Sequence, residues 1–219
     1  MTLCVYALSS PEIGRVAVTG IAGERLRTVA VGSIVAIAGE MTRAPRPTED
    51  NLRKYDRVVQ GLSRRTPALL PARYGTHVRD LYELALILAS RQMPLRRRLK
   101  TVRNRVQMTV RVPANSNVIR LVRSTGKTNE SGAEYLRSRA RDAASARDIP
   151  QFEPLRAAVR RWVRGERVEQ QGGIATVYHL VPRGSVDAYR RAIEKKAADA
   201  GVRLMVSGPW PTYAFADSW

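Results

Sequence analysis

Cysteine, aromatic residues and long apolar runs are all scarce in this chain. Cys4 is the single cysteine among 219 residues, so no disulfide can form within the chain, and a lone thiol suits a reducing cytoplasm. The longest apolar stretch, residues 29–39, is too short and too interrupted by glycine to cross a bilayer, which takes roughly 20 residues. The N-terminus lacks the basic segment of a signal peptide. We therefore expect a soluble cytoplasmic protein, and a chain of this length needs no cofactor or disulfide for a stable core.

Acidic residues are also few relative to basic ones. The chain has 38 Lys and Arg residues against 19 Asp and Glu residues, which gives a formal charge of +19 and an isoelectric point near 11.2. This excess predicts attraction to an acidic partner, although a solvated basic surface without a partner explains the composition equally well. The densest basic cluster contains no acidic residue, and its members are Arg91, Arg96, Arg97, Arg98, Lys100, Arg103 and Arg105.

Residues 1–104 are predicted to form an N-terminal α+β domain. Strand-forming residues lie at the N-terminus and on both sides of the turn at Gly32, and Thr48 is a predicted N-cap for the helix that follows. A helix at residues 80–90 is apolar nearly all round, which indicates that it is buried or covered by a partner. A further helix starting at Pro94 would turn its leucines inward and the basic cluster outward.

Residues 105–219 are predicted to form the second α+β domain. The pattern restarts with an alternating strand at residue 106, followed by a long helical region from residue 132 that continues, with interruptions, to Trp162. A hairpin at Gly172 and Gly173, a helix capped by Ser185 and ended by Gly201, and a last strand at residues 202–206 complete the series. The order β-α-β-β-α-β is that of a ferredoxin-like sandwich.

No residue pattern argues for catalysis, a cofactor or a metal. His77 and His179 lie far apart, without Cys or His neighbours at metal-ligand spacing, so both are interpreted as structural. The tripeptide at residues 126–128, Gly-Lys-Thr, resembles the end of a phosphate-binding loop, but Leu121 stands where the earlier glycine is required. We therefore expect a protein that is not an enzyme.

Nucleic-acid binding is the alternative function that the composition leaves open. The order β-α-β-β-α-β is shared by RNA-recognition domains of the RRM type, whose central strands present stacked aromatic residues. The corresponding strand here, residues 174–181, has Tyr178 as its one aromatic residue, so the stacking platform is missing. Basic charge alone would still support non-specific binding that weakens steeply with salt.

The C-terminal residues concentrate the aromatic side chains that the rest of the chain lacks. Trp210 lies between two prolines and is followed by Tyr213 and Phe215. Because each of these rings can bury roughly 150–250 Å², the tail is able to close a core or to anchor a partner. The prolines restrict the backbone on both sides of Trp210 and lower the entropy lost when the ring is placed.

Residues 208–215, Gly-Pro-Trp-Pro-Thr-Tyr-Ala-Phe, resemble the closing motif of the gas vesicle GvpL/GvpF family, with Thr212 where a second proline is usual. Three further matches lie upstream in the same order. They are the first strand at Val5 and Tyr6, the segment Leu-Pro-Ala-Arg-Tyr-Gly-Thr at residues 70–76, and Gly-x-x-Tyr-Leu at residues 132–136. The resemblance therefore spans nearly the whole chain.

The resemblance implies a non-enzymatic accessory or minor structural protein of gas vesicles, the gas-filled protein shells that give cells buoyancy. It implies a two-domain α+β fold with a ferredoxin-like second domain, and partners among the hydrophobic shell protein and other accessory proteins. Family members are often acidic, so the charge of +19 is a departure. No membrane or nucleic-acid partner is expected.

We expect this protein to bind shell subunits, shield their apolar surface and support vesicle assembly. The candidate contacts come from the apolar helix, the basic cluster and the tail. They are Leu84, Ile87, Leu88, Arg96, Arg97, Arg98, Trp210, Tyr213 and Phe215.

Overall fold

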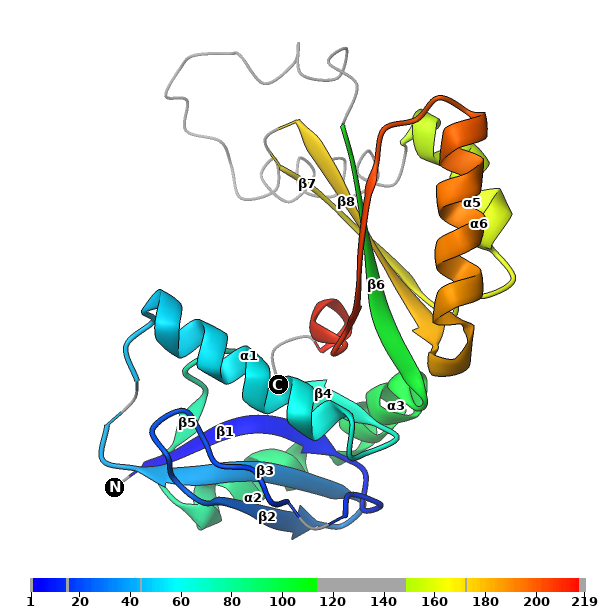
Figure 1. Cartoon of the computed structure of the whole chain (residues 1–219). Helices are drawn as coiled ribbons and strands as arrows, with labels where there is room; N and C mark the ends of the chain where they lie inside the picture. Colours follow the sequence, from blue (N-terminus) through cyan, green and yellow to red (C-terminus); the bar gives the residue numbers. More distant parts are fainter. Residues whose placement is uncertain (1, 15, 44, 114–148, 172, 217–219) are drawn as a thin grey trace, which may run out of the picture. The chain divides into compact units, whose positions relative to one another are not determined.

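The computed structural model describes residues 2–14, 16–43, 45–113, 149–171 and 173–216. The chain divides into two compact units, one formed by Met1–Gln107 with Pro209–Trp219 and the other by Met108–Gly208. The predicted mixture of helices and strands is confirmed, with two sheets (Figure 1). None of the helices within the described ranges is long and apolar enough to cross a membrane. The predicted helix from residue 132 and the tripeptide at residues 126–128 lie outside the described residues.

The first unit contains a sheet with the strand order β2-β3-β1-β4, in which β5 also pairs with β1. The strands are β1 (Thr2–Ser9), β2 (Leu26–Val31), β3 (Ile34–Met41), β4 (Leu69–Pro71) and β5 (His77–Val78). The predicted hairpin is confirmed, because β2 and β3 pair antiparallel on both sides of Gly32. Gly32 has a φ of 57°, a left-handed conformation that glycine adopts without steric cost.

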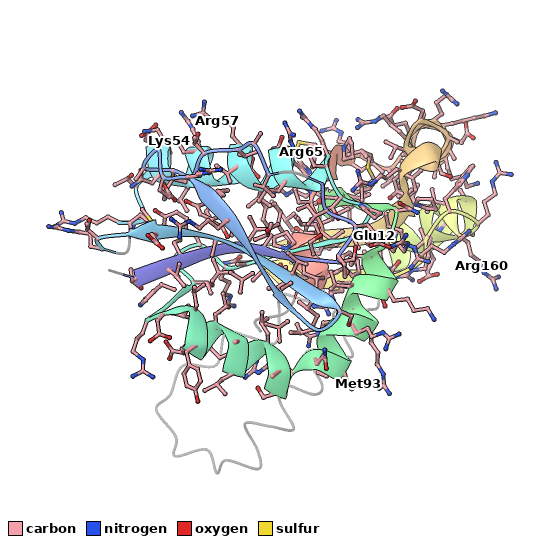
Figure 2. All side chains as sticks on the ribbon, turned by 90° about the horizontal axis from the view of Figure 1, so that it is seen from below. Glu12, Lys54, Arg57, Arg65, Met93 and Arg160 are labelled. Atoms are coloured by element: carbon pink, nitrogen blue, oxygen red, sulfur yellow. The ribbon has the colours of Figure 1, made fainter. Side chains whose placement is uncertain are left out.

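Helices cover both faces of this sheet (Figures 1 and 2). Helix α1 (Glu49–Ser63) packs on one face, and α2 (Leu81–Ser90) and α3 (Gln92–Val102) pack on the other. The central strand β1 is therefore buried from Leu3 to Ser9, with no alternation between inward and outward residues. Two-sided burial explains why this strand has a nearly continuous apolar sequence.

Two helix starts follow the expected capping chemistry. Thr48 caps α1, as predicted, with its hydroxyl accepting from the Asn51 amide at 3.3 Å. Asp80 caps α2 by accepting from the Glu83 amide at 2.8 Å, while the Glu83 carboxylate accepts from the Arg79 amide at 2.6 Å. Helix α3 begins at Gln92, two residues before the predicted start at Pro94.

The second unit is built on a sheet with the order β7-β8-β6-β9. Its elements are β6 (Arg105–Pro113), α5 (Glu153–Val159), β7 (Glu166–Gln171), β8 (Ile174–Pro182), α6 (Val186–Asp199) and β9 (Met205–Trp210). The predicted hairpin is present as the antiparallel β7–β8 pair. Helices α5 and α6 pack on each other and cover one face of the sheet, around a core that includes Phe152, Val177 and Ile193 (Figure 1).

Two predicted boundaries in this unit are corrected. Strand β9 begins at Met205 and continues through Trp210, not over residues 202–206. The cause lies at the end of α6, where Gly201 has a φ of 64° and the Val202 amide donates to the Ala197 carbonyl, so Val202 still belongs to the helix cap. Helix α5 ends at Val159, whereas the prediction extended it to Trp162.

The C-terminal tail packs within the first unit, although the sequence assigned it to residues 105–219. The Thr212 hydroxyl donates to the Leu69 carbonyl at 2.8 Å, and the Ala214 amide donates to the Gln107 side chain at 2.7 Å. The Tyr213 hydroxyl donates to the Asp56 carboxylate on α1 at 2.8 Å. Phe215 is 8% exposed, so the tail closes part of the core of this unit.

Substituting Thr212 with Val tests this closure. The change keeps the shape of the side chain but leaves the Leu69 carbonyl without the Thr212 hydroxyl, so we expect the free energy of unfolding to fall by about 1–2 kcal/mol. A urea titration followed by tryptophan fluorescence measures the loss. Thr42→Val, at an exposed position, is the matched control. Equal stability of the two variants would show that the hydrogen bond contributes nothing.

Candidate functional site

The outer side of α2 exposes large apolar side chains. Leu84 and Leu88 are fully buried against the sheet, whereas Tyr82 and Leu86 are 73% and 53% exposed. Tyr82 and Leu86 are four residues apart and so share one side of the helix, opposite the buried pair. Helix α2 is apolar on nearly all sides but contacts the sheet through only one of them, which leaves these residues in solvent.

Two further apolar residues near the two ends of α2 are exposed. Leu81, in the first turn of α2, is 52% exposed. Met93, in the first turn of α3, is 61% exposed and lies near the junction of the two helices (Figure 2). We call the surface formed by Leu81, Tyr82, Leu86 and Met93 the α2 apolar face. None of these four residues was among the sequence-predicted candidates, although the all-round apolarity of residues 80–90 was the signal that indicated such a surface.

The predicted basic cluster lies mainly on the exposed side of α3. Arg96, Arg97 and Lys100 are exposed, and Arg98 is half-buried. Leu95, Leu99 and Val102 point inward, as their spacing predicted. Arg103 is paired with Glu12 from the N-terminal segment at 2.7 Å, so one member of the cluster does have an acidic partner within the chain.

The other candidate contacts lie largely inside the protein's own fold. Leu84 and Leu88 belong to the core, and Ile87 is half-buried. In the tail, Phe215 is buried, Tyr213 is half-buried and bonded to Asp56, and Trp210 is 36% exposed. The exposed arginines lie on α3, which directly follows α2 along the chain, and most of the tail lies in the core of the first unit.

The two histidines have different surroundings. His77 is exposed, and its Nδ1 atom lies 2.8 Å from the Gly75 carbonyl. His179 is fully buried in the second unit, with its Nδ1 atom 2.7 Å from the Tyr189 hydroxyl and its Nε2 atom 2.8 Å from the Glu166 carboxylate. Among the described residues, no group of three or more His, Cys, Asp or Glu side chains is arranged to hold a metal ion.

The His179 network joins four elements of the second unit. Glu166 on β7 accepts from His179 on β8 and from Arg156 on α5, and Tyr189 on α6 bonds to the other side of the imidazole. A carboxylate only accepts, so Nε2 of His179 carries the hydrogen of that bond. Burial and the charge of Glu166 raise the pKa of Tyr189, which keeps the phenol protonated. His179 and Tyr189 are both fully buried, so this hydrogen-bond network stabilises the packing of the helices on the sheet inside the second unit.

Glu166 stays ionised far into the acid range. Burial opposes ionisation of this carboxyl, but hydrogen bonds and charge from His179 and Arg156 outweigh it and lower its pKa from 4.5 to about 2. The ionised carboxylate therefore stabilises the folded second unit. That stability is fully present above pH 4.5 and is lost as the pH falls through about 2.

The structure is that of a protein of mixed α and β structure, with two sheets in two units and a tail that packs in the first unit. Comparison with known protein families identifies the family to which the chain belongs. The model of the family "Gas vesicle synthesis protein GvpL/GvpF" matches residues 3–217. The chain belongs to the GvpL/GvpF family, as its motifs predicted. A search of curated proteins found no match.

Solved structures of two gas vesicle proteins have a similar fold. The crystal structure of GvpF from Anabaena sp. PCC7120 matches with a TM-score of 0.76 and 13% identity, over 100% of this chain and 97% of that chain. The crystal structure of GvpF from Microcystis aeruginosa matches with a TM-score of 0.74 and 12% identity, over 99% of each chain. At such low identity the likeness establishes the fold, while family membership associates the chain with gas vesicles.

Substituting Glu166 with Gln tests the stabilising role of the His179 hydrogen-bond network. We expect the free energy of unfolding of the variant at pH 7 to be lower by about 1–2 kcal/mol, after allowance for partial solvent screening. Its stability should also change less than that of the unsubstituted protein between pH 4.5 and 2. Thermal unfolding followed by circular dichroism across this range measures both effects. Glu194→Gln, at an exposed position on α6, is the control, and identical pH profiles for the two variants would contradict the assignment.

Proposed function

We propose that this protein is a non-enzymatic accessory or minor structural protein that binds the hydrophobic gas vesicle shell protein and supports vesicle assembly in the cytoplasm. The observation that carries the proposal is the α2 apolar face, found in a member of a gas vesicle family. Contiguous exposed apolar side chains mark interaction surfaces in soluble proteins. A shell protein that is hydrophobic supplies matching apolar surface.

The size of the exposed side chains supports a useful binding energy. Complete burial of one side chain of the size of Leu or Met stabilises a contact by roughly 1.5–3 kcal/mol before the entropic costs of association. The α2 apolar face has Leu81, Tyr82, Leu86 and Met93 at least half exposed. Covering them would also shield apolar surface on the bound shell subunit, as the assembly role requires.

The exposed arginines of α3 are proposed to guide the partner. Arg96, Arg97 and Lys100 follow the α2 apolar face along the chain, and residues 84–129 contain no acidic residue. Opposite charge on a partner would raise the rate of association and fix its orientation. Other accessory proteins of the vesicle are partners that this surface would suit equally well.

We assign the tail a structural part in this function. Its hydrogen bonds to Leu69, Asp56 and Gln107 hold the first unit closed, and the first unit carries the α2 apolar face. For the second unit, the element order β-α-β-β-α-β and the strand order β7-β8-β6-β9 support the ferredoxin-like description.

A double substitution, Tyr82→Glu with Leu86→Glu, tests the apolar contact. Both side chains are exposed, so the fold should survive, while two desolvated carboxylates should weaken shell-protein binding by at least about tenfold. The measurement is a pull-down of shell protein from nuclease-treated lysate at about 0.15 M salt, repeated at higher salt. Leu52→Glu is the matched control, because Leu52 is an exposed apolar residue on α1, 44% exposed.

Two outcomes of that pull-down would contradict the proposal. Equal capture of shell protein by the double variant and the unsubstituted protein would remove the α2 apolar face from the function. Loss of every protein partner at high salt, with nucleic acid recovered whenever nuclease is omitted, would favour the alternative of a basic nucleic-acid-binding protein.

A charge reversal tests the guiding role of α3. We expect Arg96→Glu with Arg97→Glu to slow association with the shell protein by about tenfold at low salt, because steering depends on unscreened charge. The difference should shrink at about 1 M salt, where the Debye length falls to about 3 Å. Surface plasmon resonance at both salt concentrations measures the rates. Unchanged rates at low salt would show that these arginines are only solvated.

A further inference from the structure

A second candidate surface lies in the other unit and has a different chemistry. The end of α5 and the turn that follows it border a shallow, open hollow of about 500 Å³. We call it the arginine hollow, and its lining residues are Ala157, Ala158, Arg160, Arg161 and Arg164. These residues were not among the sequence-predicted candidates. Arg160 and Arg161 are adjacent and Arg164 follows three residues later, but the tertiary structure is needed to reveal the hollow.

Two of the three guanidinium groups are held in place by the protein itself. The guanidinium carbon of Arg161 lies 3.9 Å from the centre of the Trp162 ring, a cation–π contact. Nη1 of Arg164 donates to the backbone carbonyls of Arg161 at 2.7 Å and Val163 at 3.2 Å. Binding of a ligand to these groups would cost little side-chain entropy, because the positions of the two arginine side chains are already fixed.

The carboxylates near the hollow pair with a different arginine. Arg156 binds Glu153 and also Glu166, at 3.1 Å from the latter. Within the part of the chain that the structure describes, none of the ion pairs involves Arg160, Arg161 or Arg164. Three arginine residues thus line one hollow, and Arg160 points outward into solvent (Figure 2). Their mutual repulsion would be relieved by an anion.

We propose that the arginine hollow binds an acidic segment of a partner protein through its Asp or Glu side chains. The planar fork of each guanidinium matches a carboxylate, with two parallel N–H···O bonds available to each pair. Ala157 and Ala158 also line the hollow, and their small apolar side chains suit the methylene groups of a Glu side chain. A hollow is complementary to a side chain that protrudes from a partner.

The same geometry disfavours nucleic acid. Binding of single strands relies on bases stacking on aromatic rings, and Arg161 already covers a face of Trp162. A duplex presents a convex row of phosphates, and three arginines gathered in a hollow would neutralise only about three of them, which gives weak binding at physiological salt. The inference does not depend on the α2 apolar face and stands whether or not that face binds the shell protein.

The test uses the full-length protein and a fluorescent peptide of alternating Glu and Ala residues. We expect fluorescence anisotropy at about 0.15 M salt to detect binding, and a matched peptide with Gln in place of Glu to bind at least about tenfold more weakly. Arg160→Glu, and more mildly Arg160→Gln, should weaken binding of the Glu peptide, the former by about tenfold. Arg160 is exposed, so both variants should keep the thermal unfolding temperature of the unsubstituted protein.

Arg203→Glu is the matched control, because Arg203 is exposed, belongs to the same unit and does not line the hollow. A loss in this control as large as that in Arg160→Glu would overturn the proposal, since net charge alone would explain the binding. Absence of binding to the Glu peptide would overturn it as well. Tighter binding of a short DNA duplex than of the peptide, weakened by the same Arg160 variants, would replace the acidic protein with nucleic acid.

Discussion

The first unit depends on being closed by both ends of the chain. Its core is formed by residues up to Gln107, and Thr212, Tyr213 and Ala214 then bond to Leu69, Asp56 and Gln107. The bond between Gln107 and Ala214 joins residues 107 positions apart, a closure that would cost considerable entropy in a flexible chain. The second unit reduces this cost, because β6 and β9 are neighbours in one sheet and bring the chain back beside the place where it left.

Much of the local structure could be predicted because the signals are local. The cap at Thr48 and the turn at Gly32 depend on a side chain or a φ angle within a few residues. The assignment of the tail to a unit could not be predicted in this way. Its aromatic residues fitted a core of either unit, and contacts between residues far apart in sequence, Tyr213 with Asp56 and Thr212 with Leu69, decide between them. The start of β9 was missed because the cap of α6 continues to Val202.

The sequence predicted the type of surface at the candidate site but not the residues that form it. Uniform apolarity of residues 80–90 indicated a helix with more apolar surface than a sheet can cover, but not which side would face the sheet. The structure turns Leu84 and Leu88 inward and leaves Tyr82 and Leu86 exposed, and this choice depends on how the helix packs on β2 and β5. Likewise, the sequence pattern predicted that His179 lies on a strand. It did not reveal that Tyr189 hydrogen-bonds to its Nδ1 atom and Glu166 to its Nε2 atom.

The distribution of charge explains how a strongly basic protein can keep selective surfaces. Some basic residues are neutralised within the described chain, such as Arg156 by Glu153 and Glu166, Arg103 by Glu12 and Lys54 by Asp50. Among the described residues, Arg96 and Arg97 on α3, and Arg160 and Arg161 at the hollow, form no ion pair with a carboxylate. Long-range attraction from a charge of +19 acts on any anion, but only short-range fit distinguishes one partner from another. In our proposals, the apolar side chains in the first unit and the fixed guanidinium groups in the second would supply that fit by different means, so each surface would select a partner of different chemistry.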